Sequence, residues 1–377
     1  MSLRRIKAMA KKEIIQIRRD IRVLIAAIFM PMLLILLFGY ALSLDVDNIP
    51  TLVLDLDQTP ISRDLAGRLA DSRYFTVVRY LHRQSEIEPA LERREALMAL
   101  VIPADFSARV SKGTGAQVQV IFDGTDSNTV SIAQGYFTGI ANSFNISHQA
   151  ARIRKAGLRM TARPLDPRIR VWFNPELKSK NFIIPGLIAV VMMVICALMT
   201  ALTISREKET GTMEQLISTP ISSGELIVGK LLPYLGLGLI EITLVVAAAV
   251  LIFKVPFNGS YLNLFLVSLI FMIGTLGWGL LISTIARNQL EASQMVILSA
   301  FLPSFLLSGF IYPIENMPVA LQVITYIVPA RYFVEVAKGL FLKGVGLEVL
   351  WPQIVFLIIY SLVVLNVARK KFSKRIV

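Results

Sequence analysis

Six long apolar runs dominate the pattern of hydrophobic and polar residues along the chain. Each is about 20 residues long, which is the length that a helix needs to cross the hydrocarbon core of a bilayer. The runs are Val23–Leu44, Phe182–Ile204, Leu231–Phe253, Tyr261–Ile285, Ala292–Tyr312 and Val349–Val367. They predict a mainly α-helical membrane protein with six transmembrane helices.

The segment between the first two runs, residues 45–180, follows a different pattern. Apolar and polar residues alternate over 51–56, 74–81, 96–102 and 116–122, and polar helical stretches separate these segments. Alternation with a period of two is typical of half-buried strands. A longer helix is predicted at about 130–156, followed by a proline-broken extended return to the membrane. The segment is therefore predicted to be an inserted external α/β domain.

Two further segments are too polar to cross a membrane. Over residues 1–22, isoleucine and alanine recur every three or four residues against a basic face, which predicts an amphipathic helix on the anionic inner leaflet. The recurring positions are Ile6, Ala10, Ile14, Ile17 and Ile21. Between the fifth and sixth runs, a proline-broken stretch with Arg331, Glu335 and Lys338 on one helical face predicts two short helices that dip back into the outer leaflet.

The distribution of charge predicts the orientation of the spans. The formal net charge is +13, and eight Lys or Arg residues lie within residues 1–22 and five within 369–375. Cytoplasmic flanks carry an excess of Lys and Arg, so both termini are expected in the cytoplasm. Glu241 is the one formal charge well inside a run. A carboxylate at that depth is costly, so it either contacts a cation or proton in a transport path or packs between helices in hydrogen-bonded or protonated form.

The composition argues against an enzyme. The chain has 55% hydrophobic residues, one cysteine and two histidines, which excludes a disulfide framework and a Cys/His metal cage. Asp55, Asp57, Asp123 and Asp126 lie at predicted strand ends and turns, where aspartate is common for structural reasons. No catalytic residue and no metal site is predicted.

One motif resembles an ATP-binding loop at first sight. Gly224, Gly229 and Lys230 have the spacing G-x-x-x-x-G-K, but Leu231 follows where a P-loop has Ser or Thr. Ser222 and Glu225 have the spacing of a capping box, so the motif is predicted to lie in the first turns of a helix. The chain is therefore expected to carry no ATP site of its own, and Lys230 is interpreted as an anchor at the membrane interface.

A short helix is predicted just before that motif. Thr212 and Gln215 also have capping-box spacing, so a helix should begin near Met213 and end before Pro220. One face of this helix would be apolar, with Met213, Leu216 and Ile217. The other would carry Glu214, Gln215 and Ser218.

The whole segment "REKETGTMEQLISTPISSGELIVGKLLPY" resembles the permease subunits of ABC exporters, specifically the type-2 membrane-domain family. "FNPELKSKNFIIPGLI", "LGWGLLISTIARNQLEA", "LPSFLLSGFIYPIENMP" and "YIVPARYF" are similar to that family as well. The large external insertion resembles the subgroup assigned to efflux of multiple drugs or lipophilic compounds.

The resemblance implies a transport subunit of the bacterial inner membrane. Residues 205–222 would be the coupling segment that contacts a separate cytoplasmic ATPase subunit, which would hold the ATP and magnesium. The candidate coupling residues are Arg206, Glu207, Glu209, Gly211, Thr212 and Glu214. The other expected partners are a second permease subunit, identical or paralogous, and membrane lipid. A periplasmic adaptor is compatible with the external domain, and nucleic acid is not expected.

By the same resemblance, the second and fifth spans of two subunits would line the substrate route. The candidate lining residues are Met192, Met193, Met199, Phe301, Ser304 and Phe305, together with Glu241. Arg331 and Glu335 would help to cap the exit. The predicted division of the chain is 1–22, 23–44, 45–180, 181–368 and a basic tail over 369–377.

An alternative function is a membrane-anchored sensor or receptor with a ligand-binding external domain. Six spans and a capped cytoplasmic element argue against it, because a sensor needs one or two spans and a signalling domain. Apolar lining residues suit varied ligands, so the sequence leaves the identity of the substrate open.

Overall fold

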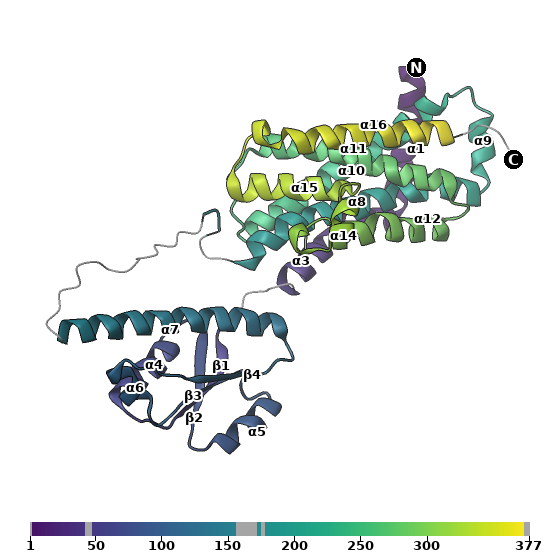
Figure 1. The fold of residues 1–377 in the computed structure, drawn as a ribbon. Helices are drawn as coiled ribbons and strands as arrows, with labels where there is room; N and C mark the ends of the chain where they lie inside the picture. The colour runs from purple at the N-terminus through teal and green to yellow at the C-terminus, as the bar shows by residue number, and fades with distance from the viewer. Residues whose placement is uncertain (1, 42–46, 156–171, 175–177, 373–377) are drawn as a thin grey trace. The chain divides into compact units, whose positions relative to one another are not determined.

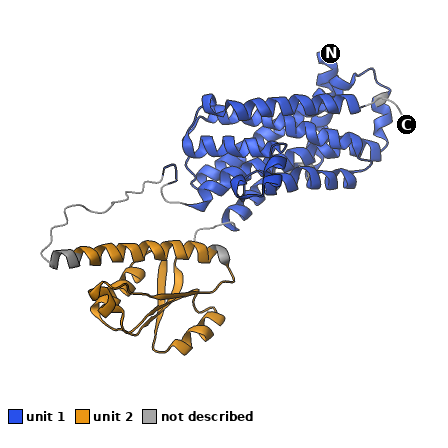
Figure 2. Cartoon of the chain, viewed as in Figure 1, with its two compact units in different colours: residues 1–43, 170–377 blue, residues 44–169 orange. Residues whose placement is uncertain are grey.

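A computed structural model describes residues 2–41, 47–155, 172–174 and 178–372. The chain divides into two compact units, one formed by residues 1–43 with 170–377 and the other by residues 44–169 (Figure 2). The predicted inserted domain, 45–180, overlaps the first of these units over residues 170–180. Each unit has its own buried core.

The first unit consists of helices (Figure 1). Its N-terminal part comprises α1 (Leu3–Arg19), α2 (Ile21–Leu24), a π-helical turn (Ile25–Phe29) and α3 (Met30–Ala41). After the second unit follow α8 (Ser179–Glu209), α9 (Thr212–Ile217), α10 (Ser223–Leu251) and α11 (Tyr261–Ile285). The remaining helices are α12 (Gln289–Val296), a π-helical turn (Ile297–Phe301), α13 (Leu302–Leu307), a 3-10 turn (Ile314–Asn316), α14 (Val319–Thr325), α15 (Pro329–Lys338), a π-helical turn (Gly339–Lys343) and α16 (Leu347–Lys371).

Five of these helical segments are long and apolar enough to cross a membrane. They are α8, α10, α11, the continuous segment Gln289–Leu307, and α16, and they match the predicted second to sixth spans. The predicted first span, Val23–Leu44, is described as far as Ala41, and its apolar helix Ala27–Ala41 is shorter than a full span. The predicted pair of short helices between the fifth and sixth spans is present, because Val319–Thr325 and Pro329–Lys343 meet at 85°.

Small residues allow α8 and α11 to pack closely at the centre of the helical unit. A Cβ atom on Gly279 would lie 2.0 Å from the carbonyl oxygen of Ala197, so only glycine fits at that crossing. One turn further on, the hydroxyl of Ser283 accepts hydrogen bonds from the backbone N–H groups of Ile204 and Ser205, at 2.8 and 2.9 Å. Gly279 and Ser283 of α11 therefore form part of a close packing surface against α8.

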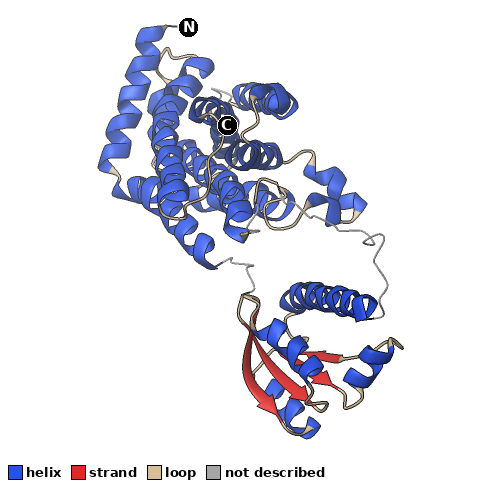
Figure 3. Cartoon of the chain, turned by 90° about the vertical axis from the view of Figure 1, so that its left-hand side faces the viewer, coloured by secondary structure: helices blue, strands red, loops and turns tan. Residues whose placement is uncertain are grey.

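The second unit is a mixed α/β fold (Figure 3). Its strands are β1 (Ile49–Asp55), β2 (Phe75–Leu81), β3 (Met98–Ile102) and β4 (Gln119–Phe122), in the order β2-β1-β3-β4. The first three strands are parallel and β4 is antiparallel to β3. The helices are α4 (Pro60–Ala70), a 3-10 turn (Gln84–Glu86), α5 (Ile87–Glu92), α6 (Phe106–Lys112) and α7 (Ser127–Lys155).

Helices cover both faces of this sheet. On one face, Val53 and Leu100 pack with Leu65 of α4 and Phe137 of α7. On the other, Leu52 and Leu54 pack with Ile87 and Ala90 of α5. Strands that are buried on both faces are mostly apolar, as β3 is throughout and β1 is apart from Thr51 and Asp55. All four predicted strands and the long helix are confirmed to within a few residues.

The aspartates at the end of β1 serve the turn that follows. Asp55 accepts hydrogen bonds from the N–H groups of Asp57 and Gln58 and from the Ser62 hydroxyl, at 2.7–3.1 Å. Thr59 caps α4 in a capping box with Ser62. These carboxylates thus fulfil structural roles, as expected for aspartate at a strand end.

Candidate functional site

The G-x-x-x-x-G-K motif lies in a helix, as its capping pattern predicts. The Ser222 hydroxyl accepts from the N–H of Glu225, and the Glu225 carboxylate accepts from the N–H of Ser222, so both halves of the capping box are formed at the start of α10. Gly229 faces α1. A Cβ atom there would lie 2.7 Å from Cβ of Met9, so the glycine permits the two helices to touch.

Lys230 has a different role from the predicted interface anchor. Its side chain is 1% exposed, and its Nζ atom lies 2.9 Å from Oε1 of Glu13 and 2.9 Å from Oε2 of Glu207. A lysine that anchors a helix at the interface keeps its ammonium group in water. The interpretation as an anchor is therefore wrong, and Lys230 is one centre of a buried ion-pair network.

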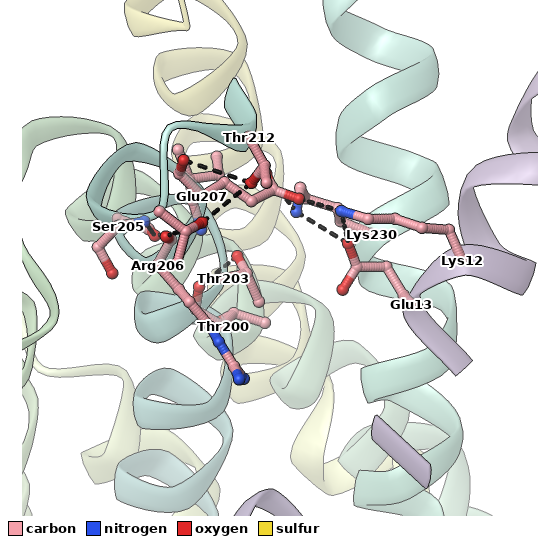
Figure 4. Close-up of polar contacts among 12 residues, drawn as sticks. Lys12, Glu13, Thr200, Thr203, Ser205, Arg206, Glu207, Thr212 and Lys230 are labelled. Carbon is pink, nitrogen blue, oxygen red and sulfur yellow. Dashed lines mark hydrogen bonds and ion pairs between the residues drawn. The ribbon is translucent and has the colours of Figure 1, made fainter. Parts of the chain in front are cut away.

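This network joins three helices that are far apart in the sequence (Figure 4). Glu13 comes from α1, Glu207 from the end of α8 and Lys230 from α10. Lys12 completes the group through ion pairs with Glu207 and, at 3.5 Å, with Glu13. The negative charges of the two carboxylates are compensated by the positive charges of the two lysines, and buried charges are tolerated when they are paired in this way. We call these four residues the ion-pair cluster.

Further polar contacts hold α1 against α10. Tyr234 of α10 directs its hydroxyl toward Glu13 at 3.5 Å, and Glu225 accepts from the N–H of Ser2 at 2.6 Å and pairs with Arg5 at 3.5 Å. The buried face of α1 is Met9, Glu13 and Ile17. Of the predicted apolar stripe, Ile17 belongs to that face, whereas Ile14 and Ile21 are 47% and 64% exposed.

The end of α8 is also tied to the turn between α11 and α12. Lys208 donates to the backbone carbonyl oxygens of Thr284 and Ala286, at 2.7 and 3.0 Å. Glu209 accepts hydrogen bonds from the side-chain amide and the backbone N–H of Gln289, at 2.8 and 3.3 Å, and these bonds join the end of α8 to the start of α12. Arg206 pairs with Asp20, beside α1.

The short helix after α8 begins one residue earlier than predicted. Its N-cap is Gly211, with φ of 72°, and Thr212 is its first residue, so the predicted capping box at Thr212 is wrong. Glycine adopts this left-handed conformation without the strain that a Cβ atom would cause. The Thr212 hydroxyl instead lies 3.4 Å from the carbonyl oxygen of Glu207 and 3.1 Å from the Thr210 hydroxyl.

The two faces of α9 differ as predicted at the positions whose side chains the structure describes, which do not include Ile217. Met213 and Leu216 pack against a buried cluster that includes Ile204, Ile221 and Leu226 from the adjoining helix ends. Glu214, Gln215 and Ser218 are exposed. Beside α9 lies an open groove of about 700 Å³, whose walls include Arg5, Lys12 and Gln16 of α1 and Gln215 and Leu216 of α9.

The six candidate coupling residues thus fall into two groups. Gly211, Thr212 and Glu214 are exposed on or next to α9, and Glu209 is exposed beside Gln289. Arg206 is partly buried, and Glu207 is 3% exposed. Glu207 is therefore not on the surface where a partner could contact it, because its carboxylate pairs with Lys12 and Lys230 within the chain.

The candidate lining residues are mostly enclosed within the single chain. Met192, Met193, Met199 and Ser304 are at most 5% exposed, whereas Phe301 and Phe305 are partly exposed, with ring centroids 5.3 Å apart. Glu241 is 1% exposed and lies between α10 and α8, where its Oε2 atom is 3.8 Å from Sγ of Cys196. Its other oxygen has no hydrogen-bond partner among the described residues.

The candidate exit-cap residues lie together on α15. Nε of Arg331 is 3.8 Å from Oε1 of Glu335, and the guanidinium group stacks over the ring of Tyr326 at 4.0 Å. Glu335 accepts from the side-chain amide of Gln353 on α16 at 2.9 Å. These contacts fix the bent helix pair against α16.

Within the described residues, no three His, Cys, Asp or Glu side chains are grouped as metal ligands would be. The contacts of the site instead connect the short helix α9 to the ends of four longer helices, α1, α8, α10 and α11. Sequence reasoning missed Lys12 and Glu13. A signal for Glu13 was available, because it is the one acidic residue among the first 19 and lies four residues from both Met9 and Ile17 on the same face.

Comparison with known proteins gives a consistent picture. The family described as ABC-2 family transporter protein matches residues 21–370. The chain is 39% identical to the probable multidrug ABC transporter permease YbhS of Escherichia coli K12, over 100% of this chain and 98% of that protein. It is 31% identical to the probable multidrug ABC transporter permease YbhR of the same strain, over 93% of this chain and 94% of that protein. The inner membrane transport permease YhhJ is 28% identical over 87% and 86% of the two chains.

Proposed function

The chain belongs to the ABC-2 family of transporter proteins, and we propose that it is the membrane-spanning subunit of an exporter driven by a separate cytoplasmic ATPase subunit. The chain itself carries out no ATP hydrolysis. ATP and magnesium are held by the partner. The names of the relatives, multidrug permeases, support lipophilic or drug-like compounds as the exported substrates.

The observation that carries this proposal is the construction of the segment from Arg206 to Ser222. A helix of six residues exposes Glu214 and Gln215 while its apolar side is held by buried side chains of the adjoining helices. Exposed polar groups on a fixed support suit docking of a partner, because they set register and orientation. The groove next to α9 adds a concave surface in which a segment of the ATPase can lie.

A movement of α9 would be passed to the spans as a rigid-body motion. Gly211 is the sole residue between Thr210, where α8 is capped, and the first residue of α9, so little of the displacement is lost in the connection. The ion-pair cluster then links the end of α8 to α1 and α10, and Lys208 links it to α11. Closure of the ATPase would thereby shift several spans together.

Substrate would pass along a route between two such subunits, identical or paralogous. The enclosed positions of Met192, Met193, Met199 and Glu241 support packing roles in the single chain, so the partly exposed Phe301 and Phe305 are the stronger candidates for contact with substrate. Arg331 and Glu335 remain the candidates for capping the exit.

We place the chain in the inner membrane with both termini in the cytoplasm, and residues 44–169 on the outer side. The apolar spans support a multi-pass membrane protein, and the excess of Lys and Arg at both termini supports this orientation. The α/β unit would then be available to a periplasmic adaptor.

Affinity purification from the native host in a mild detergent tests the proposal. Wild type should retain an ATPase subunit, measured by ATP hydrolysis in the eluate. Glu214→Arg should lose it, because the substitution reverses an exposed charge on α9 without removing any contact in the described part of the chain. Glu207 is unsuitable for this purpose because its substitution would remove one of the two carboxylates that pair with Lys12 and Lys230 inside the chain.

The matched control is Glu348→Arg. Glu348 is also an exposed glutamate in the first turn of a helix, α16, but that turn lies at the opposite end of the spans from the α9 side. The control should retain the ATPase. Equal retention by Glu214→Arg and wild type would contradict the docking role of α9.

A further inference from the structure

An apolar groove of about 400 Å³ runs between α10 and α11. Its walls are formed by Ile242, Val246, Ala247, Val250, Leu264 and Phe265, together with Thr243, Leu251 and Tyr261. The volume lies within the range of roughly 300–1,000 Å³ that is typical of sites for small ligands. Leu251 and Phe265 are 75% and 40% exposed, so the groove opens on the outward surface of two membrane-spanning helices. Its natural surroundings are therefore lipid chains.

A lysine follows shortly after the end of α10, whose last residue, Leu251, lines this groove. Lys254 follows Leu251 by three residues, is exposed, and makes no hydrogen bond or ion pair with any residue that the structure describes. Its neighbours fix its position: Phe253 and Val255 are 4% and 2% exposed, and their N–H groups donate to Ala248 and Ala249 of α10. Because the chain buries the residues on both sides, the Lys254 ammonium group is left on the surface.

A tyrosine from the start of α11 lines the groove as well. Tyr261 is the first residue of α11, is 59% exposed, and stacks on Phe257 with ring centroids 4.1 Å apart. Phe257 in turn packs edge-on against the buried Phe341, at 4.8 Å. Tyrosine and lysine at the ends of membrane helices commonly lie at the level of the lipid headgroups.

From this arrangement we propose that the chain binds one anionic phospholipid between α10 and α11. An acyl chain occupies the groove, and the headgroup phosphate lies at the Lys254 ammonium group and the Tyr261 hydroxyl. An apolar groove alone would accept any lipid or a second copy of the chain. The unpaired cation that follows α10 selects a lipid with excess negative charge.

Native mass spectrometry of the full chain, purified in mild detergent, tests this site. Phosphatidylglycerol and phosphatidylcholine with the same acyl chains are added in separate titrations. Wild type should bind one phosphatidylglycerol with clear preference. Ala247→Phe, which fills the groove, should lose the bound lipid of both kinds, and Lys254→Gln should reduce the preference for phosphatidylglycerol about fivefold, the effect of one cation near an anionic headgroup.

Two controls match these variants. Val355→Phe adds the same ring to an exposed apolar position of α16, and Lys343→Gln removes another exposed lysine near the ends of the spans. Both should behave as wild type. An unchanged lipid count in Ala247→Phe would overturn the proposal. A preference unaltered in Lys254→Gln would overturn the role of Lys254. If Ala247→Phe instead abolished a dimer and left lipid binding intact, the groove would belong to a second copy.

A photoactivatable phosphatidylglycerol with a diazirine in its acyl chain provides a test that does not depend on substitutions. In wild type, labelling should concentrate on the peptide covering residues 242–251. Addition of a lipophilic transport substrate should leave it unchanged. Uniform labelling of α10, α11 and α16 would contradict a defined site, and displacement by the substrate would assign the groove to cargo. The inference requires a membrane-spanning chain and is independent of what the exporter carries.

Discussion

Replacing Lys230 by methionine tests whether the ion-pair cluster holds α1, α8 and α10 together. The substitution keeps most of the side-chain length and removes the charge that both carboxylates share at 2.9 Å. Glu13 and Glu207, which are 1% and 3% exposed, would then depend on Lys12 alone. Lys12 is 41% exposed and more weakly placed, so the two buried carboxylates would be left under-compensated.

The magnitude follows from the burial of these groups. Removing one partner from a buried pair costs about 3–5 kcal/mol. Because Lys12 remains, we expect the lower end, about 3 kcal/mol. For a unit of this size, about 2–4 °C of melting temperature corresponds to 1 kcal/mol, so Lys230→Met should melt about 6–12 °C below wild type.

The assay is the fraction of folded protein that remains on size-exclusion chromatography after heating in mild detergent. Lys343→Met, an exposed lysine, should melt like wild type. A triple variant with methionine at Glu13, Glu207 and Lys230 should recover much of the loss, because replacing the buried members of an ion-pair group by apolar residues is often close to neutral, and the remaining Lys12 is 41% exposed. A Lys230→Met melting temperature within about 1 °C of wild type would refute the reasoning, and so would a triple variant less stable than the single one.

Two further predictions concern packing and pH. Gly229→Ala should destabilise the helical unit by about 1–3 kcal/mol, because its Cβ would lie 2.7 Å from Cβ of Met9, whereas Gly236→Ala, with no atom within 4 Å, should be neutral or stabilising in the same melting assay. In the α/β unit, burial raises the pKa of Asp64, but hydrogen bonds from His148 and Arg68 outweigh it and hold that pKa below its usual value of 3.8. A lowered carboxyl pKa contributes stability above the unfolded pKa and loses it as the pH falls through the folded value, so the α/β unit should lose stability below about pH 4. Hydrogen exchange of α4 and α7 at pH 5 and pH 3 should show a smaller loss in Asp64→Asn than in wild type; an equal loss in both would contradict the assignment.

The sequence predicted the elements of the fold well because their patterns are local. The five apolar runs from Phe182 onward became spans, and the alternating segments became the four strands of one sheet. The capping box at Ser222 was predicted correctly, since its two partners are three residues apart. The similar spacing at Thr212 failed because the preceding Gly211 adopts the left-handed conformation and takes the N-cap position itself.

The candidate site was predicted in part. The exposed face of α9 follows from its helical period, and Glu214 was assigned to it correctly. The ion-pair cluster could not be predicted in the same way, because Glu13, Glu207 and Lys230 come from three helices separated by up to 217 positions. From the sequence alone, the charges of a basic N-terminal helix and a lysine at the start of a span are both usually interpreted as contacts with the membrane surface. Their ion pairing inside the protein becomes visible only when the contacts between α1, α8 and α10 are known.

Site-specific photo-cross-linking from α9 tests the central claim most directly. A photoreactive phenylalanine derivative at Gln215, an exposed residue of α9, should cross-link in native membranes to a protein that contains an ATP-binding P-loop. The same residue at Glu348, at the other end of the spans, should not. A cross-link from Gln215 to the ATPase would establish α9 as the docking element. If Gln215 gave no such product while Glu348 or another distant position did, α9 would not be the place where this permease meets its ATPase.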